Sequence, residues 1–204
     1  MITIIDYGMG NLGSIVNMIK RIGYSSEVTS DISKIASAEK IILPGVGHFD
    51  KAMQNISGLG LLDIIKKKAL NDKTPMLGIC LGMQLMCKSS EEGKEKGIGL
   101  IDADVKRFFF EENQKLKIPH MGWNLATPNN KNNLFSSLSG EARFYFVHSF
   151  HVVCNNKNDS LATTNYGYDF ASAFASENII GVQFHPEKSH KFGMQFLKNF
   201  IENY

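Results

Sequence analysis

The 204-residue chain has few of the features that mark secreted, membrane or fibrous proteins. Three cysteines cannot all pair, and a chain of this size needs no disulfides, so we expect reduced thiols and a cytoplasmic protein. No apolar run approaches the roughly 20 residues that span a bilayer, and the N-terminus lacks the basic and apolar regions of a signal peptide. Net charge is only +2 with scattered basic residues, which predicts neither a nucleic-acid nor a membrane partner. No cysteine–histidine cluster has metal-ligand spacing, so we expect no metal and no cofactor.

The first half of the chain alternates between short apolar runs and amphipathic stretches. With 43% hydrophobic residues and no repeats, the chain can bury a core, and we expect one domain over residues 1–204. Strands are predicted at Ile2–Ile5, Tyr24–Val28, Lys40–Leu43 and the run ending at Ile79, and helices at Ile15–Ile22, at His48–Leu70 with a break near Gly58–Gly60, and from Met83. This alternation predicts an α/β fold with a mostly parallel sheet flanked by helices.

The second half consists of short segments rich in β-branched and aromatic residues, which predicts antiparallel strands added to the parallel sheet. The predicted strands are Val105–Phe110, Leu125–Thr127, Phe144–Val147, His151–Cys154, Ser160–Thr164, Phe170–Ala175 and Ile179–Phe184, with a polar loop at 127–133. Ser189 is predicted to be the N-cap of a last helix, in which Phe192, Phe196 and Phe200 form a core stripe. The Lys66–Lys68 run is predicted to be a solvated helix face.

Two glycine-rich turns follow predicted strands. Gly8, Gly10 and Gly13 have the spacing of a dinucleotide-binding turn, but such a site needs a carboxylate at the end of the second strand. Glu27 lies inside that strand, so the pattern does not favour a dinucleotide. In Pro44–Gly47, two glycines directly after a strand let the backbone approach a ligand closely, although a plain turn into the next helix remains the alternative.

The segment around Cys80 predicts a sharp strand-to-helix turn. Gly78 and Gly82 stand near the cysteine on either side, and small residues tolerate the strained backbone of such an elbow. Free N–H groups at the start of the following helix favour a thiolate and neighbouring negative charge. A buried cysteine that only fills space is the alternative. Because ligands bind outside the carboxyl ends of parallel strands, the turns after Ile5, Leu43 and Ile79 are expected to meet at one crevice.

His185 and Glu187 stand at the end of the last predicted strand. Residues i and i+2 of an extended chain point the same way, so the carboxylate of Glu187 could orient the imidazole of His185. Taken alone, a His-Pro-Glu segment predicts a turn. Together with a cysteine on an elbow, it predicts a thiol acyl-transfer site.

These motifs carry a resemblance to a known family. The segments Gly78–Gln84 and Val182–Ser189 resemble those of class I (triad) glutamine amidotransferases. Four more stretches are similar to the glutaminase subunits of imidazole glycerol phosphate synthases, and the match runs in order along essentially the whole chain: Asp6–Asn11, Pro44–Gly47, Pro119–Asn124 and Tyr145–Phe150. The resemblance implies a flavodoxin-like α/β sheet with an antiparallel addition.

The resemblance also implies a mechanism. Cys80 would attack the side-chain amide of glutamine, His185 would move the protons, and Glu187 would hold His185. The oxyanion would be held by the N–H of Leu81 and by one from the segment Gly45, Val46 and Gly47. The remaining substrate-binding positions that the resemblance implies are Gln84, Ser149 and Phe150.

A partner is implied in the same way. The family's partner is a (β/α)8-barrel cyclase subunit, which forms a heterodimer with the glutaminase and uses its ammonia to make imidazole glycerol phosphate and aminoimidazole carboxamide ribotide. Positions at or near the implied interface are Asn11, Met121, Trp123 and Lys188. Without the resemblance, Trp123 would be expected in the core, because tryptophan is highly buried on average.

Other functions stay open on the sequence alone. Ile101–Val105 and His190–Phe192 depart from the family's usual pattern, which leaves room for a paralogous glutaminase that supplies ammonia for surface-glycan sugars. A cysteine peptidase or other hydrolase could use the same triad. A binding module without catalysis would require the triad to have no chemical role.

Overall fold

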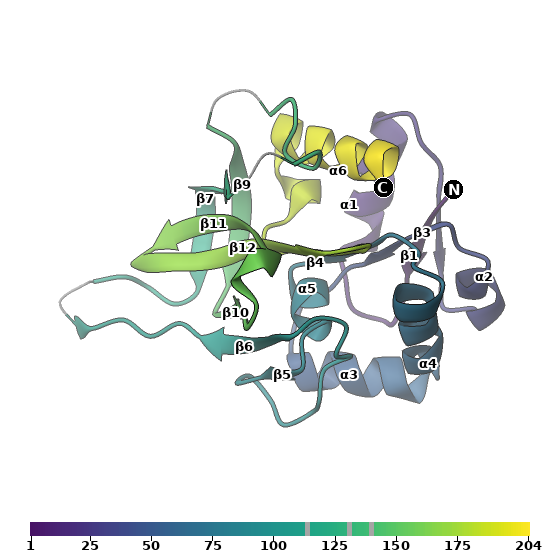
Figure 1. The fold of residues 1–204 in the computed structure, drawn as a ribbon, viewed down its shortest axis with the longest axis horizontal. Helices are drawn as coiled ribbons and strands as arrows, with labels where there is room; N and C mark the ends of the chain where they lie inside the picture. Colours follow the sequence, from purple (N-terminus) through teal and green to yellow (C-terminus); the bar gives the residue numbers. More distant parts are fainter. Residues whose placement is uncertain (113–114, 130–131, 139–140) are drawn as a thin grey trace.

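The computed structural model describes residues 1–112, 115–129, 132–138 and 141–204, and Figure 1 shows their arrangement. Residues 130 and 131 of the predicted polar loop lie outside the described part. The elements of the first half are β1 (Ile2–Ile5), α1 (Leu12–Arg21), β2 (Ser26–Thr29), α2 (Ile32–Ala36), β3 (Lys40–Leu43), α3 (Phe49–Gly58), α4 (Leu61–Lys66), the π-helical turn η1 (Lys67–Asn71), β4 (Met76–Ile79) and α5 (Leu81–Leu85). Those of the second half are β5 (Ser89–Ser90), β6 (Ala103–Arg107), β7 (His120–Leu125), β8 (Thr127–Pro128), β9 (Arg143–His148), β10 (Phe150–Cys154), the 3₁₀ turn η3 (Lys157–Asp159), β11 (Ser160–Tyr166), β12 (Tyr168–Ser176), β13 (Ile179–Val182), the 3₁₀ turn η4 (Pro186–Lys188) and α6 (His190–Asn203).

One mixed sheet organises the molecule. Its strand order is β2-β1-β3-β4-β13-β12-β10-β6-β5, with β11 and β8 joined beside β12. The strands from β2 to β13 are parallel, whereas β12 pairs antiparallel with β13, and β10 pairs antiparallel with β12 and β6. A separate antiparallel pair joins β7 to β9. The predicted parallel sheet with antiparallel strands added in the second half is confirmed.

Each face of the sheet covers its own core. Ile4 of β1 and Ile42 of β3 belong to one buried cluster, while their neighbours Ile5 and Leu43 belong to the other, as the alternation of side chains along a strand requires. Helices α1 and α6 cover the first face, and α3, α4 and α5 cover the second (Figure 1). The predicted aromatic stripe of α6 enters the first core, where Phe196 is fully buried.

Two predictions on local structure are wrong. Lys68 is not on a solvated face: it is only 6% exposed, and its ammonium donates to the carbonyl of Ala36 and pairs with Asp72. The chain leaves α4 through the π turn, which departs from regular α-helical spacing at this lysine. The predicted strand Leu125–Thr127 is in fact the junction between β7, which begins at His120, and the short β8.

Candidate active site

Cys80 stands at the elbow between β4 and α5. Its φ of 53° and ψ of −111° lie outside the regions that non-glycine residues usually adopt, so the backbone is strained there. The elbow is held on one side by the bond from the Cys80 N–H to the carbonyl of Val182, at 2.7 Å. Leu81 is the first residue of α5, so its N–H has no acceptor within the helix and is free for a ligand. The elbow predicted from sequence is therefore present.

Glycine at position 82 lets the elbow pack directly against β3. A Cβ on Gly82 would lie 1.9 Å from the carbonyl oxygen of Leu43, and one on Gly78 would lie 2.8 Å from the backbone of Gly82. Both contacts are with backbone atoms, which cannot move aside as a flexible side chain can. The two glycines that flank Cys80 are thus required by packing at the crossing of β3, β4 and α5.

We expect Gly82→Ala to destabilise the fold by about 1–3 kcal/mol, the usual cost of forcing an extra methyl group into a packed site. Gly13→Ala is the matched control, because Gly13 lies in α1 and its added Cβ would meet nothing within 4 Å. That control should gain roughly 0.5–1 kcal/mol from better helix propensity. The check is the free energy of unfolding in urea. Equal midpoints for Gly82→Ala and the unaltered protein would show that the elbow can relax around a methyl group.

The Pro44–Gly47 turn follows β3, the neighbour of β4, and lies against the elbow. A Cβ on Gly45 would lie 2.6 Å from the hydroxyl of Tyr7 and 2.8 Å from the amide nitrogen of Gly82. The Tyr7 hydroxyl donates to the carbonyl of Pro44 at 2.6 Å, so the glycine-rich turn after β1 supports this segment. Gly45 is buried below the site, whereas Val46 and Gly47 line the cavity.

His185 and Glu187 form a buried pair beyond the end of β13. The Nδ1 atom of His185 lies 2.8 Å from Oε1 of Glu187, and both side chains are 1% exposed. Glu187 belongs to the 3₁₀ turn η4, so the pair forms through that turn and not through the extended chain expected from the sequence. The backbone N–H of His185 donates to the carbonyl of Tyr145 on β9.

Ser189 has a different role from the predicted one. It occupies the N-cap position of α6, but its side chain makes no capping hydrogen bond. Its hydroxyl donates to the carbonyl of His185 at 2.6 Å and accepts from the N–H of Tyr145 at 3.0 Å. Ser189 therefore fixes the backbone that carries the imidazole, a role that the capping pattern alone could not reveal.

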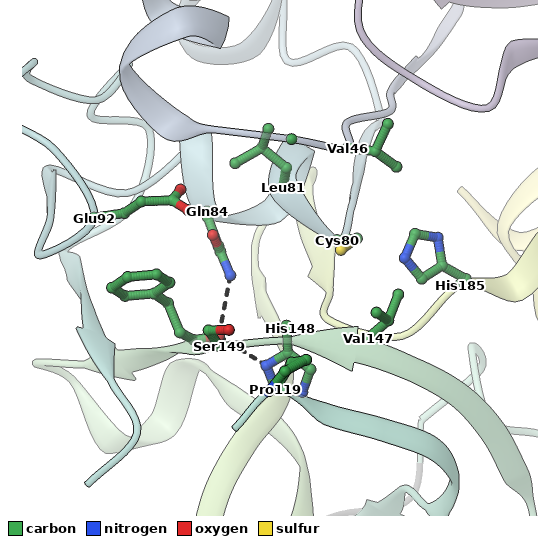
Figure 2. Close-up of a pocket in the computed structure, with 12 residues that line it drawn as sticks. Val46, Cys80, Leu81, Gln84, Glu92, Pro119, Val147, His148, Ser149 and His185 are labelled. Carbon is green, nitrogen blue, oxygen red and sulfur yellow. Dashed lines mark hydrogen bonds between the residues drawn. The ribbon is translucent and has the colours of Figure 1, made fainter. Parts of the chain in front are cut away.

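The free nitrogen of His185 faces the cysteine. Burial by itself would lower the pKa of His185, but the neighbouring Cys80 thiolate and the Glu187 carboxylate outweigh it and raise that pKa to about 10. The Nε2 atom is buried and has no hydrogen-bond partner within the described residues. Figure 2 shows the ring next to Cys80 in one cavity. An unpaired imidazole nitrogen beside a thiol can take the thiol proton and leave a thiolate, the form in which a cysteine is nucleophilic.

The cavity has a volume of about 320 Å³ and joins the elbow to the start of β10. Its lining includes six of the predicted substrate-binding and oxyanion positions: Val46, Gly47, Leu81, Gln84, Ser149 and Phe150. Four lining residues were assigned no role from the sequence: Glu92, Pro119, Val147 and His148. Pro119 and His148 belong to segments that carried the family resemblance, whereas no pattern in the sequence marks Glu92.

Gln84 is held firmly in the wall of the cavity. Its Nε2 donates to the carbonyl of Phe150 at 3.1 Å and to Oε1 of Gln183 at 3.0 Å, which uses both amide hydrogens. The Nε2 of Gln183, in turn, lies 3.7 Å from the sulfur of Cys80. The Oε1 of Gln84 is then the part of the amide left to accept a hydrogen bond from a substrate.

Two of the four predicted interface residues contact the ring of Tyr145, whose carbonyl accepts from the backbone N–H of His185. Met121 and Trp123 share one face of β7 and are 62% and 47% exposed. The Trp123 ring packs edge-on against Tyr145, and the ammonium of Lys188 lies 5.7 Å from the centre of the same tyrosine ring. Asn11 precedes α1, which contacts the turn that carries Lys188. The core position that tryptophan frequency alone suggested for Trp123 is wrong.

The other two cysteines lack this environment. All three cysteines are free, but burial raises the pKa of the Cys154 thiol to about 11 and that of Cys87 well above its usual value. The thiol of Cys87 donates to the carbonyl of Met83 at 3.7 Å. Cys80 is therefore the cysteine equipped for nucleophilic attack.

The arrangement defines a class of protein. A thiol on an elbow, an imidazole oriented by a buried carboxylate, and free backbone N–H groups beside the cavity are the parts needed for acyl transfer through a thioester. The family model for class I glutamine amidotransferases matches residues 3–204. The chain belongs to this family, and it is an enzyme of the glutamine amidotransferase kind.

Several relatives that match along nearly their whole length are named as subunits of imidazole glycerol phosphate synthase. The chain is 55% identical over 202 residues to "Imidazole glycerol phosphate synthase subunit HisH 2" of Methanococcus maripaludis, with 99% of each chain covered. It is 46% identical to the subunit HisH 2 of Pseudomonas aeruginosa, again with 99% of each chain covered. It is also 46% identical to the subunit HisH of Bdellovibrio bacteriovorus, covering 99% of this chain and all of that one.

Solved structures agree on the fold. A glutamine amidotransferase crystal structure superposes with a TM-score of 0.75 at 15% identity, covering 98% of this chain and 97% of that one. PurLQS from Thermotoga maritima gives a TM-score of 0.74 at 16% identity, covering 99% and 97%. Within the part of the chain that the structure describes, no helix is both long and apolar enough to cross a bilayer.

Proposed function

We propose that this protein hydrolyses glutamine through a thioester on Cys80 and delivers the ammonia to the cyclase subunit of imidazole glycerol phosphate synthase. The observation that carries the proposal is the placement of Cys80 beside the unpaired Nε2 of His185, with Glu187 behind the ring. The family model supports the glutamine chemistry, and the relatives' names, subunits of imidazole glycerol phosphate synthase, support the presence of a partner subunit.

The steps follow from the positions of the side chains. His185 accepts the thiol proton of Cys80 through Nε2, and the sulfur attacks the amide carbon of glutamine. The N–H of Leu81 and one from the Val46–Gly47 segment hold the oxyanion; one such donor contributed about 2.7–4 kcal/mol in a well-studied protease. The intermediate collapses as His185 returns the proton to the departing ammonia. Water then attacks the thioester and releases glutamate.

Substrate selection follows from the wall of the cavity. Glutamine carries an amide and an α-ammonium group. The Oε1 of Gln84 is available to accept from the substrate, and the neighbouring backbone at Ser149 and Phe150 completes that side. Glu92 also lines the cavity, where its Oε2 accepts from the N–H of Phe49 at 2.8 Å. A carboxylate fixed in this way can pair with the α-ammonium of a free amino acid, which a peptide substrate lacks at an internal residue.

The partner is proposed to be the barrel-shaped cyclase subunit, bound through Asn11, Met121, Trp123 and Lys188. Ammonia released into water is mostly protonated and no longer nucleophilic, so direct delivery to a partner makes chemical sense. An exposed tryptophan and methionine on one face of β7 also suit a protein interface, where both residue types are enriched. We further propose that residues 1–204 form one amidotransferase domain in a cytoplasmic heterodimer.

Binding of the cyclase subunit should depend on Trp123. We expect Trp123→Ala to weaken the complex by about 2 kcal/mol or more, as central aromatic residues of interfaces do. Leu59→Ala is the control, because Leu59 is equally exposed at 47% but follows α3, at the end of that helix away from the site. Isothermal titration of each variant with the cyclase subunit measures the difference. Equal losses, or no loss, would place the interface elsewhere.

Activity tests the proposal as a whole. The chain mixed with the cyclase subunit and its nucleotide ligand should release glutamate from glutamine well above the rate of the chain alone. Cleavage of peptides in place of glutamine would identify a cysteine peptidase. No turnover by any mixture would favour a binding module.

A second candidate partner is a paralogous cyclase-like subunit of surface-glycan synthesis. Two of the relatives are named HisH 2, which suggests that their organisms have more than one such glutaminase. The glutaminase half contacts only glutamine and an interface, so a paralogous cyclase-like subunit of surface-glycan synthesis would use the same site. Titration against both kinds of subunit from the same organism distinguishes them. Stimulation by the glycan-pathway subunit alone would replace the histidine-pathway assignment.

A further inference from the structure

Two buried histidines beside the cavity have no part in the mechanism above. The Nδ1 of His148 lies 2.7 Å from the carbonyl oxygen of Phe150, and its Nε2 lies 3.0 Å from Nδ1 of His120. The Nε2 of His120 lies 3.2 Å from Nδ2 of Asn124. All four ring nitrogens are thus occupied, and the chain of contacts leads from β7 to the wall of the cavity.

The direction of every hydrogen bond in this chain can be deduced. A carbonyl oxygen can only accept, so Nδ1 of His148 carries the proton that reaches Phe150. In a neutral ring the Nε2 of His148 must then accept, so Nδ1 of His120 donates to it. By the same reasoning the Nε2 of His120 accepts from the amide of Asn124.

The surroundings keep both rings neutral. His120 stacks on Tyr166 and Phe146 at 4.1 and 4.9 Å between ring centres, and His148 lies 5.2 Å from Phe108. Burial lowers the pKa of His120 to about 4 and that of His148 to about 3, in the latter case against the opposing bond to Phe150. Neither ring is therefore protonated at neutral pH, and the deduced tautomers hold.

The hydrogen-bond chain from Asn124 through His120 to His148, called the relay below, ends on the carbonyl oxygen of Phe150, which also fixes Gln84. The carbonyl of Phe150 receives two bonds, one from Nδ1 of His148 and one from the amide of Gln84. Figure 2 marks both as dashed lines that start at the labelled side chains of His148 and Gln84. With that carbonyl held, the Nε2 of Gln84 stays turned toward Phe150 and Gln183, and its Oε1 stays available to the cavity. If the carbonyl turned away, the amide of Gln84 would lose one of the two acceptors that set its orientation.

We propose that His148 and His120 are positioning residues for substrate binding: a one-way relay Asn124–His120–His148 holds the Phe150 carbonyl, which orients the amide of Gln84 toward glutamine. This inference rests on the proposed glutaminase function. It predicts that the two histidines affect the KM for glutamine and take no part in proton transfer. They act through a backbone carbonyl and a glutamine amide, and touch neither the thiol nor the reacting carbon.

A pair of neutral amide variants tests the relay in the full-length chain assayed with its cyclase subunit. His148→Asn places an N–H donor where Nδ1 stands, whereas His148→Gln places its amide where Nε2 stands. We expect His148→Gln to raise KM for glutamine about 3- to 10-fold, the effect of losing one ordinary hydrogen bond, with little change in kcat. His148→Asn should stay within about twofold of the unaltered KM.

His151 supplies the control. It is also buried, lies 4.8 Å from Phe108 between ring centres, and bonds through Nε2 to the hydroxyl of Tyr168, away from the cavity. His151→Gln should leave KM unchanged. An equal rise in KM for His151→Gln, equal KM values for the two His148 variants, or a loss confined to kcat would each overturn the proposal while leaving the glutaminase function intact.

Imidazole nitrogen NMR of the unaltered chain at pH 7 is independent of activity. Both His120 and His148 should show neutral rings with the proton on Nδ1. A proton on Nε2, or a charged ring, at either residue would overturn the relay even in an active enzyme. An unaltered chain that does not hydrolyse glutamine but shows both expected tautomers would instead refute the proposed function.

Discussion

Cys80→Ser is expected to reduce glutamine hydrolysis by at least about 10⁴-fold while the protein stays folded. Loss of the nucleophile in a comparable triad costs on the order of 10⁶-fold, and a serine hydroxyl is not ionised by an imidazole as a thiol is. Serine nearly matches the size of cysteine, so the elbow and its bond to Val182 should persist. Glutamate release under saturating glutamine, with and without the cyclase subunit, measures the loss.

Cys154→Ser is the matched control for this experiment. Cys154 is partly buried on β10, and burial raises the pKa of its thiol to about 11, so it should be unreactive at neutral pH. Its variant should retain full turnover. The cyclase subunit should bind Cys80→Ser with unchanged affinity, because Cys80 is 6% exposed inside the cavity. Turnover that survives in Cys80→Ser would remove the thiol from the mechanism.

The parallel half of the fold could be predicted because its signals are local. The strands Ile2–Ile5 and Lys40–Leu43 have the predicted bounds, since each is a short apolar run that ends at a turn residue and is buried on both faces. Helix α2 was missed. It has five residues, too few to show a helical period, and it depends on the side chain of Asp31, which accepts from two backbone N–H groups.

The antiparallel half depends on pairing that a single segment does not show. The stretch His120–Leu125 has no continuous apolar run, yet it is a strand because it pairs with Arg143–His148 in register. That pairing places His120 opposite His148 and Trp123 opposite Tyr145. The relay and the exposed tryptophan are consequences of this register, which is why the sequence marked these residues only through the family resemblance.

The site itself was partly predictable because several of its residues follow strands of the parallel half, whose signals are local. Cys80, His185 and the Pro44–Gly47 turn each follow a strand, and β3, β4 and β13 are neighbours, so their carboxyl ends bring these residues together. Gln183 and Ser189 gave no such signal. Their roles depend on the amide contact with Gln84 and on the bonds to Tyr145, which exist only in the folded chain.

Glu187→Gln is expected to lower kcat by about 10²- to 10⁴-fold, although the residue touches no substrate. The carboxylate accepts from Nδ1 of His185 and so keeps Nε2 free to take the thiol proton. A glutamine amide can donate to Nδ1 instead, which places the ring proton on Nε2, where it blocks proton transfer. In a serine-protease triad the equivalent change of aspartate to asparagine costs about 10⁴-fold for this reason. Glu177→Gln is the control, because Glu177 is exposed and pairs with Lys73 on the surface.

The pH dependence of Glu187→Gln separates this tautomer effect from simple loss of structure. The carboxylate is one of the groups that raise the pKa of His185 to about 10, so its removal lowers that pKa. Release of ammonia needs the protonated imidazole, and activity therefore declines as pH rises through the pKa of His185. The alkaline decline of kcat should move to lower pH in Glu187→Gln and stay in place in Glu177→Gln. An unmoved decline with reduced kcat would mean that Glu187 acts by packing alone and does not control the charge of the imidazole.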